Sequence, residues 1–141
     1  MNELKSTVAK IADGDSFYVD DKTSVRLLGI DAPELEQKGG RESKARLSEL
    51  LPIGSEVSLL YQHRDRYNRI LAIVFRADVN VNLQMILEGQ AIIYWQYIND
   101  WIGDRRILFK AEKAAQRQKR GVWDMKDFIE PKIFRQSKHK T

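Results

Sequence analysis

Residues 8–28, VAKIADGDSFYVDDKTSVRLL, alternate short apolar runs with acidic turns, and this stretch decides the fold. The runs Val8 to Ile11, Phe17 to Val19 and Val25 to Leu28 are rich in β-branched and aromatic residues, as strands are. Asp-Gly-Asp and Asp-Asp-Lys separate them, and such clusters mark turns. The stretch therefore predicts three successive strands of a meander.

A helix and a hairpin follow this meander. Leu47 and Leu50 share one face of a helical pattern, and Pro52 and Gly54 end this helix. Two further apolar runs, Glu56 to Tyr61 and Ile70 to Arg76, flank a polar turn. The sequence therefore predicts a helix inserted between the meander and a two-stranded hairpin.

The period of the apolar residues changes after the hairpin. Leu83 and Ile86 share a helical face, and Leu108 and Ala111 share another in a later segment. Residues 91–97 are apolar and aromatic, and their pattern fits either a strand or an irregular packed segment. Five strands and three helices predict an α+β protein, mainly a five-stranded barrel of the oligonucleotide-binding type.

Composition limits the class of protein before any motif is used. The chain has 141 residues, of which 43% are hydrophobic and 31% charged, as expected for one compact domain. No run approaches the roughly 20 apolar residues that span a bilayer. We expect a single domain at residues 1–127, a basic C-terminal tail at residues 128–141, and no membrane partner.

The ends of the chain give expectations about location and charge. The first five residues lack the apolar core of a signal peptide, so we expect a secreted or periplasmic protein if a signal peptide was removed and a cytoplasmic one otherwise. Lys132, Arg135, Lys138 and Lys140 cluster near the C-terminus. We interpret this cluster as a solvated tail rather than a dedicated nucleic-acid arm.

The residue inventory also restricts the metal chemistry. The chain has no cysteine and only two histidines, so any metal must be held by oxygen. Asp15 and Asp31 are the candidate carboxylate ligands of a hard divalent cation, and the Ala32 carbonyl is a third because Pro33 keeps that residue extended. Asp13, two residues before Asp15, would either orient a metal-bound water or stabilise the turn.

The remaining charged residues of these motifs fit phosphodiester hydrolysis. Glu34 lies three residues beyond Asp31 and is the candidate base for the attacking water. Arg26 and Arg69 are candidates for the phosphate oxygens, because planar guanidiniums bind such oxygens in a bidentate way. Each motif alone is ordinary turn or loop sequence. Their occurrence together, with a net charge of +4, favours a metal-dependent nuclease.

Three motifs carry a family resemblance: Asp-Gly-Asp-Ser at 13–16, Arg-Leu-Leu-Gly-Ile-Asp-Ala-Pro-Glu at 26–34 and Asp-Arg-Tyr-Asn-Arg at 65–69. In order and spacing they resemble the staphylococcal nuclease family, over about residues 8–123. The resemblance implies a five-stranded barrel with three helices. It also implies a monomer that cleaves DNA and RNA with calcium and leaves 3′-phosphates.

The resemblance also assigns roles to individual residues. Arg26, Glu34 and Arg69 match the catalytic residues, and Asp15, Asp31 and the Ala32 carbonyl match the calcium ligands, with Asp13 close by. Tyr67 matches a phosphate contact, and Trp95 or Tyr97 matches a ring that stacks on a base, with Trp95 the closer match by position. Stacking tolerates any base, which suits a nuclease of broad substrate range. We expect DNA and RNA as substrates, with single strands preferred.

Two other functions remain open at this stage. A catalytically silent barrel that binds nucleic acid or protein would not need the complete set of site residues. A calcium-regulated structural domain would use the aspartates but not Arg26, Glu34 or Arg69. For the metal itself, manganese or magnesium is an alternative to calcium, since oxygen sites bind all three.

Overall fold

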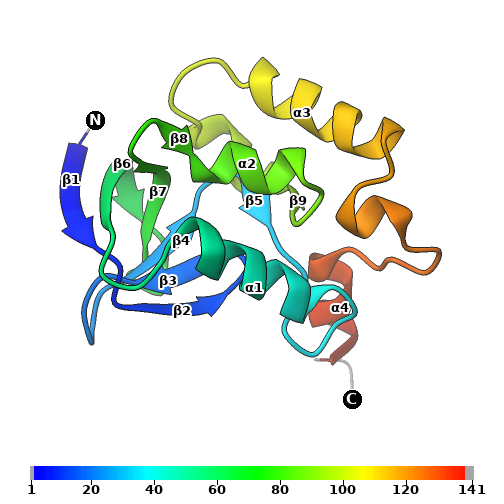
Figure 1. Cartoon of the computed structure of the whole chain (residues 1–141), viewed down its shortest axis with the longest axis horizontal. Coiled ribbons are helices and arrows are strands. Elements are labelled where there is room, and N and C mark those ends of the chain that lie inside the picture. The colour runs from blue at the N-terminus through cyan, green and yellow to red at the C-terminus, as the bar shows by residue number, and fades with distance from the viewer. Residues whose placement is uncertain (1, 139–141) are drawn as a thin grey trace.

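A curved sheet forms the centre of the protein in the computed structural model, which describes residues 2–138 (Figure 1). The strands are β1 (Asn2–Thr7), β2 (Lys10–Asp13), β3 (Ser16–Tyr18), β4 (Ser24–Leu27), β5 (Ile30–Asp31), β6 (Glu56–Arg64), β7 (Ile70–Arg76), β8 (Val79–Asn80) and β9 (Ile92–Ile93). The helices are α1 (Gly40–Leu50), α2 (Val81–Leu87), α3 (Arg106–Arg117) and α4 (Pro131–Lys138), with 3-10 turns η1 (Trp95–Asp100) and η2 (Gly121–Asp124).

The seven-stranded sheet has the order β1-β6-β7-β4-β3-β2, with β8 added to β7. The predicted meander is β2-β3-β4, the predicted hairpin is β6-β7, and both are confirmed with ends shifted by a few residues. β4 and β7 pair in parallel, which joins the two units. β1 and β2 lie at opposite ends of this order, so the pairings within residues 2–138 do not close the sheet. The predicted α+β class is confirmed.

Helices cover the sheet on two sides. α1 packs against β2, whereas α2 packs against β7 and α3 (Figure 1). The three predicted helices are confirmed as α1, α2 and α3. Phe17, Leu27, Leu47 and Met85 come from the sheet and the helices, and all four are fully buried in one apolar core. Burial of such side chains is the main contribution to stability.

A buried asparagine at the start of α2 fixes the end of β4. Asn82 donates to the carbonyls of Leu28 (2.9 Å) and Ala72 (3.0 Å) and accepts from the amide of Val74 (2.9 Å). All these groups are buried, so the bonds replace those that water would make. Leu28 directly follows β4, which keeps the segment that enters β5 in place.

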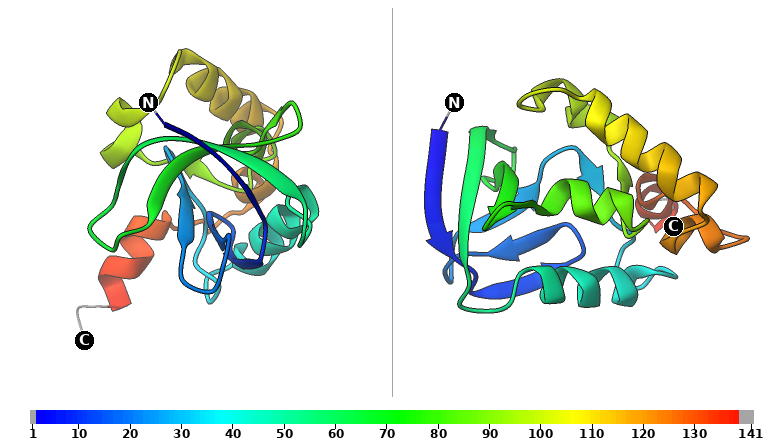
Figure 2. Two further views of the ribbon diagram at one scale, coloured as in Figure 1. Left: turned by 90° about the vertical axis from the view of Figure 1, so that its left-hand side faces the viewer. Right: turned by 45° about the horizontal axis from the view of Figure 1, so that its top comes forward.

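Two segments differ from the simplest expectation. Residues 91–97, left open between a strand and an irregular segment, contain both the short strand β9 and the start of η1. Within the predicted basic tail, residues 131–138 form the helix α4, which projects at the edge of the molecule, away from α3 (Figures 1 and 2). Lys140 lies outside the described residues. The domain boundary near residue 127 stays a prediction.

Candidate active site

The turn between β2 and β3 is closed by the side chain of Asp13. Its Oδ1 accepts hydrogen bonds from the Asp15 amide (3.2 Å) and the Ser16 hydroxyl (2.7 Å). Gly14 lets α1 approach this turn, because a Cβ on Gly14 would lie 2.0 Å from the hydroxyl oxygen of Ser43. Of the two roles open for Asp13, these bonds are those of the turn-stabilising one.

Arg26 of β4 lies between two buried carboxylates. Its Nη1 is 3.3 Å from Asp15 Oδ2, and its Nη2 is 3.3 Å from Asp31 Oδ1. Asp15 Oδ2 also accepts a hydrogen bond from the Ala32 amide (2.9 Å). Since β4 is hydrogen-bonded to β3 on one side and β7 on the other, the backbone of Arg26 is well fixed. One guanidinium thus joins the first two sequence motifs.

Glu34 is held by a compact loop after β5. The Glu34 amide donates to Gln37 Oε1 (3.1 Å), and the Glu34 carbonyl accepts from the Gln37 amide (2.9 Å). Gly40, at the start of α1, packs so closely that a Cβ there would lie 1.9 Å from the Glu34 carbonyl oxygen. The loop therefore needs glycine at position 40 to keep the backbone of Glu34 in this position.

The third motif forms a tight turn between β6 and β7. Asp65 accepts hydrogen bonds from the amides of Tyr67 (2.9 Å) and Arg69 (3.0 Å) and from Arg69 Nε (2.7 Å). The Arg69 guanidinium also lies 5.4 Å from the centre of the Tyr67 ring. Asp65 thus positions both of the motif's candidate substrate contacts.

These elements surround one pocket of about 280 Å³. It is lined by Asp13, Asp15, Arg26, Ala32, Glu34, Arg66, Tyr67, Arg69, Tyr94, Gln96, Tyr97 and Arg135. The structure therefore brings together the three predicted catalytic residues, Tyr67, Tyr97 and most of the predicted metal site. Asp31 does not line the pocket but contacts two arginines that do.

Trp95 lies apart from this pocket. Its ring is 63% exposed and stacks on Phe109, with 5.3 Å between ring centres and 15° between planes. It lines a neighbouring hollow with Arg105 and Arg106. Tyr97, in contrast, lines the pocket and packs edge-on against Tyr94. Which of the two rings stacks on a base stays a prediction.

Two residues of the site, Arg135 and Tyr94, were not predicted from the sequence. Arg135 of α4 contacts Asp31 through Nη1 (3.2 Å) and Nη2 (3.1 Å), and it contacts Glu34 through Nη1 (2.8 Å). Tyr94 lies under the Arg26 guanidinium, 5.2 Å from ring centre to Cζ. The basic residues at spacing three in 132–138 were a signal for a helix with one basic face.

Crowding of carboxylates changes their protonation. Burial, and then the neighbouring charge of Asp15, raise the pKa of Asp13 to about 7. Burial also acts to raise the pKa of Asp15, but the Arg26 guanidinium and hydrogen bonds outweigh it, so this pKa lies below its usual value. Asp13 therefore holds a proton more readily than Asp15, which stays ionised beside Arg26.

The oxygen atoms that these residues offer are the test of whether a cation fits. Asp15 and Asp31 offer carboxylate oxygens, and hard cations such as calcium and magnesium prefer oxygen ligands completed by water. Within residues 2–138 no three side chains of His, Cys, Asp or Glu are gathered closely enough to hold a metal by themselves. The residues thus fit a hydrated divalent cation held by few protein ligands, with Ala32 beside it. The metal roles of these residues stay predictions.

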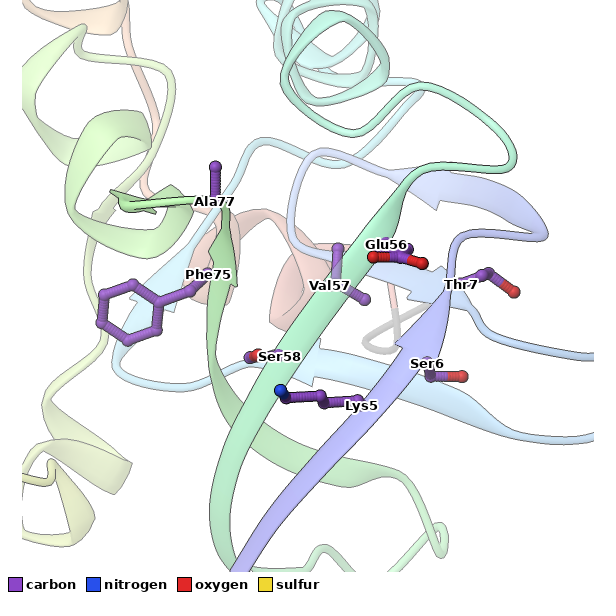
Figure 3. Close-up of a pocket in the computed structure, with 8 residues that line it drawn as sticks. All are labelled: Lys5, Ser6, Thr7, Glu56, Val57, Ser58, Phe75 and Ala77. Carbon is purple, nitrogen blue, oxygen red and sulfur yellow. The ribbon is translucent and has the colours of Figure 1, made fainter.

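A second hollow, of about 400 Å³, differs from this pocket in chemistry. It lies between β1, β6 and the end of β7, as Figure 3 shows. Its lining residues are Lys5, Ser6, Thr7, Glu56, Val57, Ser58, Phe75 and Ala77. This set has one carboxylate and one amine and resembles an ordinary sheet surface. The cluster of arginines and carboxylates therefore identifies the smaller pocket as the candidate active site.

The sequence of this chain is similar to those of known proteins. The model of the family described as staphylococcal nuclease homologue matches residues 24–125. An Escherichia coli protein named as an uncharacterized endonuclease is 37% identical over 140 residues, covering 96% of this chain and 88% of its own. A Shigella flexneri protein named micrococcal nuclease is 33% identical, covering 99% of this chain and 85% of its own.

The chain belongs to the staphylococcal nuclease family. A Haemophilus influenzae protein, also named as an uncharacterized endonuclease, is 39% identical over 91% of this chain and 71% of its own length. These similarities support a nuclease function in general. Among the described residues, no helix is both long and apolar enough to cross a membrane.

Proposed function

We propose that this protein is a calcium-dependent endonuclease that hydrolyses phosphodiester bonds of DNA and RNA and leaves 3′-phosphate ends. The observation that carries the proposal is that Arg26, Glu34 and Arg69 line one pocket with Asp15. A base, two guanidiniums and a carboxylate ligand are the groups that metal-assisted hydrolysis of a phosphodiester uses. We further propose that the protein acts as a monomer.

In this proposal Glu34 is the general base. Its side chain is 31% exposed, so water can reach the carboxylate from the pocket. Glu34 accepts a proton from the attacking water as the new oxygen–phosphorus bond forms and the bond from phosphorus to the 5′-oxygen breaks. The 5′-oxygen takes a proton from solvent, and the phosphate stays on the 3′ side.

The two arginines stabilise the charge of the transition state. Arg26 is fixed by its strand and Arg69 by Asp65, so both guanidiniums are oriented before the substrate binds. Their planar donors match the equatorial oxygens of the phosphate better than lysine would. A calcium ion held by Asp15, Asp31 and the Ala32 carbonyl would polarise the phosphate and lower the pKa of the attacking water.

The rim of the pocket suits a single strand. Tyr67 is 65% exposed, with the Arg66 guanidinium 4.9 Å and the Arg69 guanidinium 5.4 Å from its ring centre. A phosphate beside Tyr67 would therefore meet two positive charges. Tyr97 and the exposed Trp95 provide rings for unpaired bases. We propose a preference for single-stranded DNA and RNA on these contacts.

The test is release of acid-soluble nucleotides from heat-denatured DNA and from RNA, in calcium or in excess chelator. Glu34→Gln keeps the shape of the side chain but removes the base, so the rate should fall by about 10²- to 10⁴-fold. The matched control is Glu49→Gln, an exposed glutamate of α1 whose nearest cation is Arg46 at 3.8 Å. It should cut as the parent does, and the products should carry 3′-phosphates.

Two results would reject the proposal. Equal rates for the parent and Glu34→Gln would show that Glu34 is not the base. If the parent binds nucleic acid but cuts it with none of calcium, manganese and magnesium, the protein is instead the catalytically silent binding module.

A further inference from the structure

Arg135 contacts one proposed metal ligand, Asp31, and the proposed general base, Glu34. Its guanidinium spans both oxygens of Asp31, at 3.2 and 3.1 Å, and reaches Glu34 Oε1 at 2.8 Å. Asp31 Oδ1 already faces Arg26 Nη2 at 3.3 Å. Both oxygens of a proposed metal ligand, and one oxygen of the proposed base, are thus occupied by guanidinium groups.

The charge of Arg135 is secured by these contacts. A guanidinium stays protonated in proteins, and here it is paired with two carboxylates. A permanent positive charge therefore lies against Asp31 and Glu34. A positive charge in this position and a divalent cation on Asp31 satisfy the same electrostatic need and exclude one another.

The rest of α4 is attached mainly to the loop that carries Glu34. Lys138 pairs with Glu36, and the Gln37 side chain donates to the Ile129 carbonyl just before the helix. Pro131 is buried, but Ile133 is 52% exposed. Polar contacts with one short loop, on a helix at the edge of the molecule, are weak enough to open without unfolding the sheet (Figure 2).

We propose that α4 is an intramolecular latch in which Arg135 occupies the divalent-cation site and covers Glu34, so that cation binding and release of α4 are coupled. This inference rests on the proposed function, since it takes the cation site from there. With α4 docked, Asp31 is neutralised and Glu34 is engaged. With α4 released, both carboxylates are available, and the basic face of the helix is free to meet the substrate.

Coupling of this kind is reciprocal. If docking of α4 weakens cation binding, cation binding must weaken docking of α4 by the same factor. Removing the Arg135 charge should therefore tighten cation binding, although it removes a contact from the site. A residue that helps to hold the cation or the substrate would give the opposite sign.

The experiment measures calcium binding to the full chain by calorimetry, without nucleic acid. Arg135→Gln is compared with Lys132→Gln, which removes the same charge from the same helix. Arg135→Gln should lower the calcium dissociation constant by about tenfold, within the usual range of coupling between sites. Lys132→Gln should change it by less than about twofold, since Lys132 is exposed and its charge is screened by salt. In the parent, calcium should speed hydrogen exchange of the α4 amides.

The outcomes separate the latch from the proposed function. If Arg135→Gln leaves the dissociation constant unchanged, raises it, or lowers it no more than Lys132→Gln does, the latch is overturned and the nuclease proposal is untouched. Unchanged α4 exchange at saturating calcium overturns the latch as well. If calcium binds neither the parent nor Arg135→Gln, the calcium site of the proposed function fails and the latch fails with it.

Discussion

Two parts of the pocket are held in place in different ways. The floor of the pocket comprises Asp15 and Arg26, which line it, together with Asp31, which is paired with Arg26; none of the three is more than 8% exposed. The rim of the pocket consists of Glu34, Tyr67, Arg69 and Arg135. The side chains of Glu34 and Arg135 are 31% and 32% exposed, and Tyr67 is 65% exposed. In the floor, Arg26 and Asp31 lie on strands and Asp15 lies in the tight turn between β2 and β3, whereas the rim lies on loops, turns and the helix α4.

This difference separates stability from turnover. The charged side chains of the floor are removed from water, so each one is stable only while its partner remains. Charges of the rim keep part of their hydration, and their ion pairs contribute little to stability. Substitutions in the floor of the pocket should therefore affect both folding and catalysis. Substitutions in the rim should affect catalysis with little change in folding.

The largest effect is expected for Arg26→Met. The variant keeps most of the side-chain volume but leaves Asp15 and Asp31 buried without the guanidinium that joins them. The free energy of unfolding should fall by about 3–5 kcal/mol. The cleavage rate should fall by about 10²- to 10³-fold through loss of a transition-state donor. Urea unfolding and a nucleotide-release assay measure the two effects.

Arg117→Met is the matched control for this variant, because Arg117 is an exposed residue near the end of α3. It should change the free energy of unfolding by less than about 0.5 kcal/mol. If Arg26→Met unfolds at the same urea concentration as Arg117→Met, the buried carboxylates do not need Arg26. The distinction between the floor and the rim of the pocket is then wrong.

A smaller effect is expected for Asp65→Asn, because Asp65 holds the rim residues Tyr67 and Arg69 in place. The asparagine keeps an acceptor for the turn amides but loses the charged contact with Arg69 Nε. The free energy of unfolding should fall by about 1–2 kcal/mol. Loss of the orientation of Arg69 should lower the cleavage rate by about tenfold to a hundredfold. Asp20→Asn is the control, since Asp20 closes a similar turn between β3 and β4.

This stability difference should depend on pH. Burial acts to raise the pKa of Asp65, but hydrogen bonds from Arg69 and Tyr67 outweigh it and place the pKa below its usual value of 3.8. The native state therefore favours ionised Asp65, and its contribution is complete above about pH 4 and lost as the pH falls through the folded-state pKa. Unfolding curves of the parent and Asp65→Asn should converge in acid. A gap that does not narrow as the pH falls below 4 would contradict this assignment.

Local sequence was enough to predict the floor of the pocket. The Asp-Gly-Asp-Ser turn and the segment from Arg26 to Glu34 are each one short run of chain, and neighbouring strands of a meander bring them together. The turn at residues 65–69 follows from its hairpin in the same way. The family resemblance then placed these three runs in one site before their distances were known.

The missing parts of the site depend on contacts between distant residues. Arg135 lies 101 residues from Glu34 along the chain, and its pattern of charges also fits an exposed tail. Asn82 reads as an ordinary helix residue, although it bonds to Leu28, 54 residues away. The two-residue strands β5 and β9 are too short to produce a period in the sequence. Only the folded chain shows these contacts.

The smallest effects should come from the rings at and beyond the rim. Tyr97 lines the pocket and Trp95 lies outside it on Phe109, so Tyr97→Ala should weaken binding of a dinucleotide more than Trp95→Ala does. The expected loss for Tyr97→Ala is about 1 kcal/mol, the lower end of the range for stacking on one base. For a longer single strand, Trp95→Ala should cause a similar loss. Fluorescence anisotropy in chelator measures binding without cleavage. If Trp95→Ala weakens the dinucleotide more, the ring outside the pocket is the one that stacks on the reacting nucleotide, and the rim must extend to Phe109.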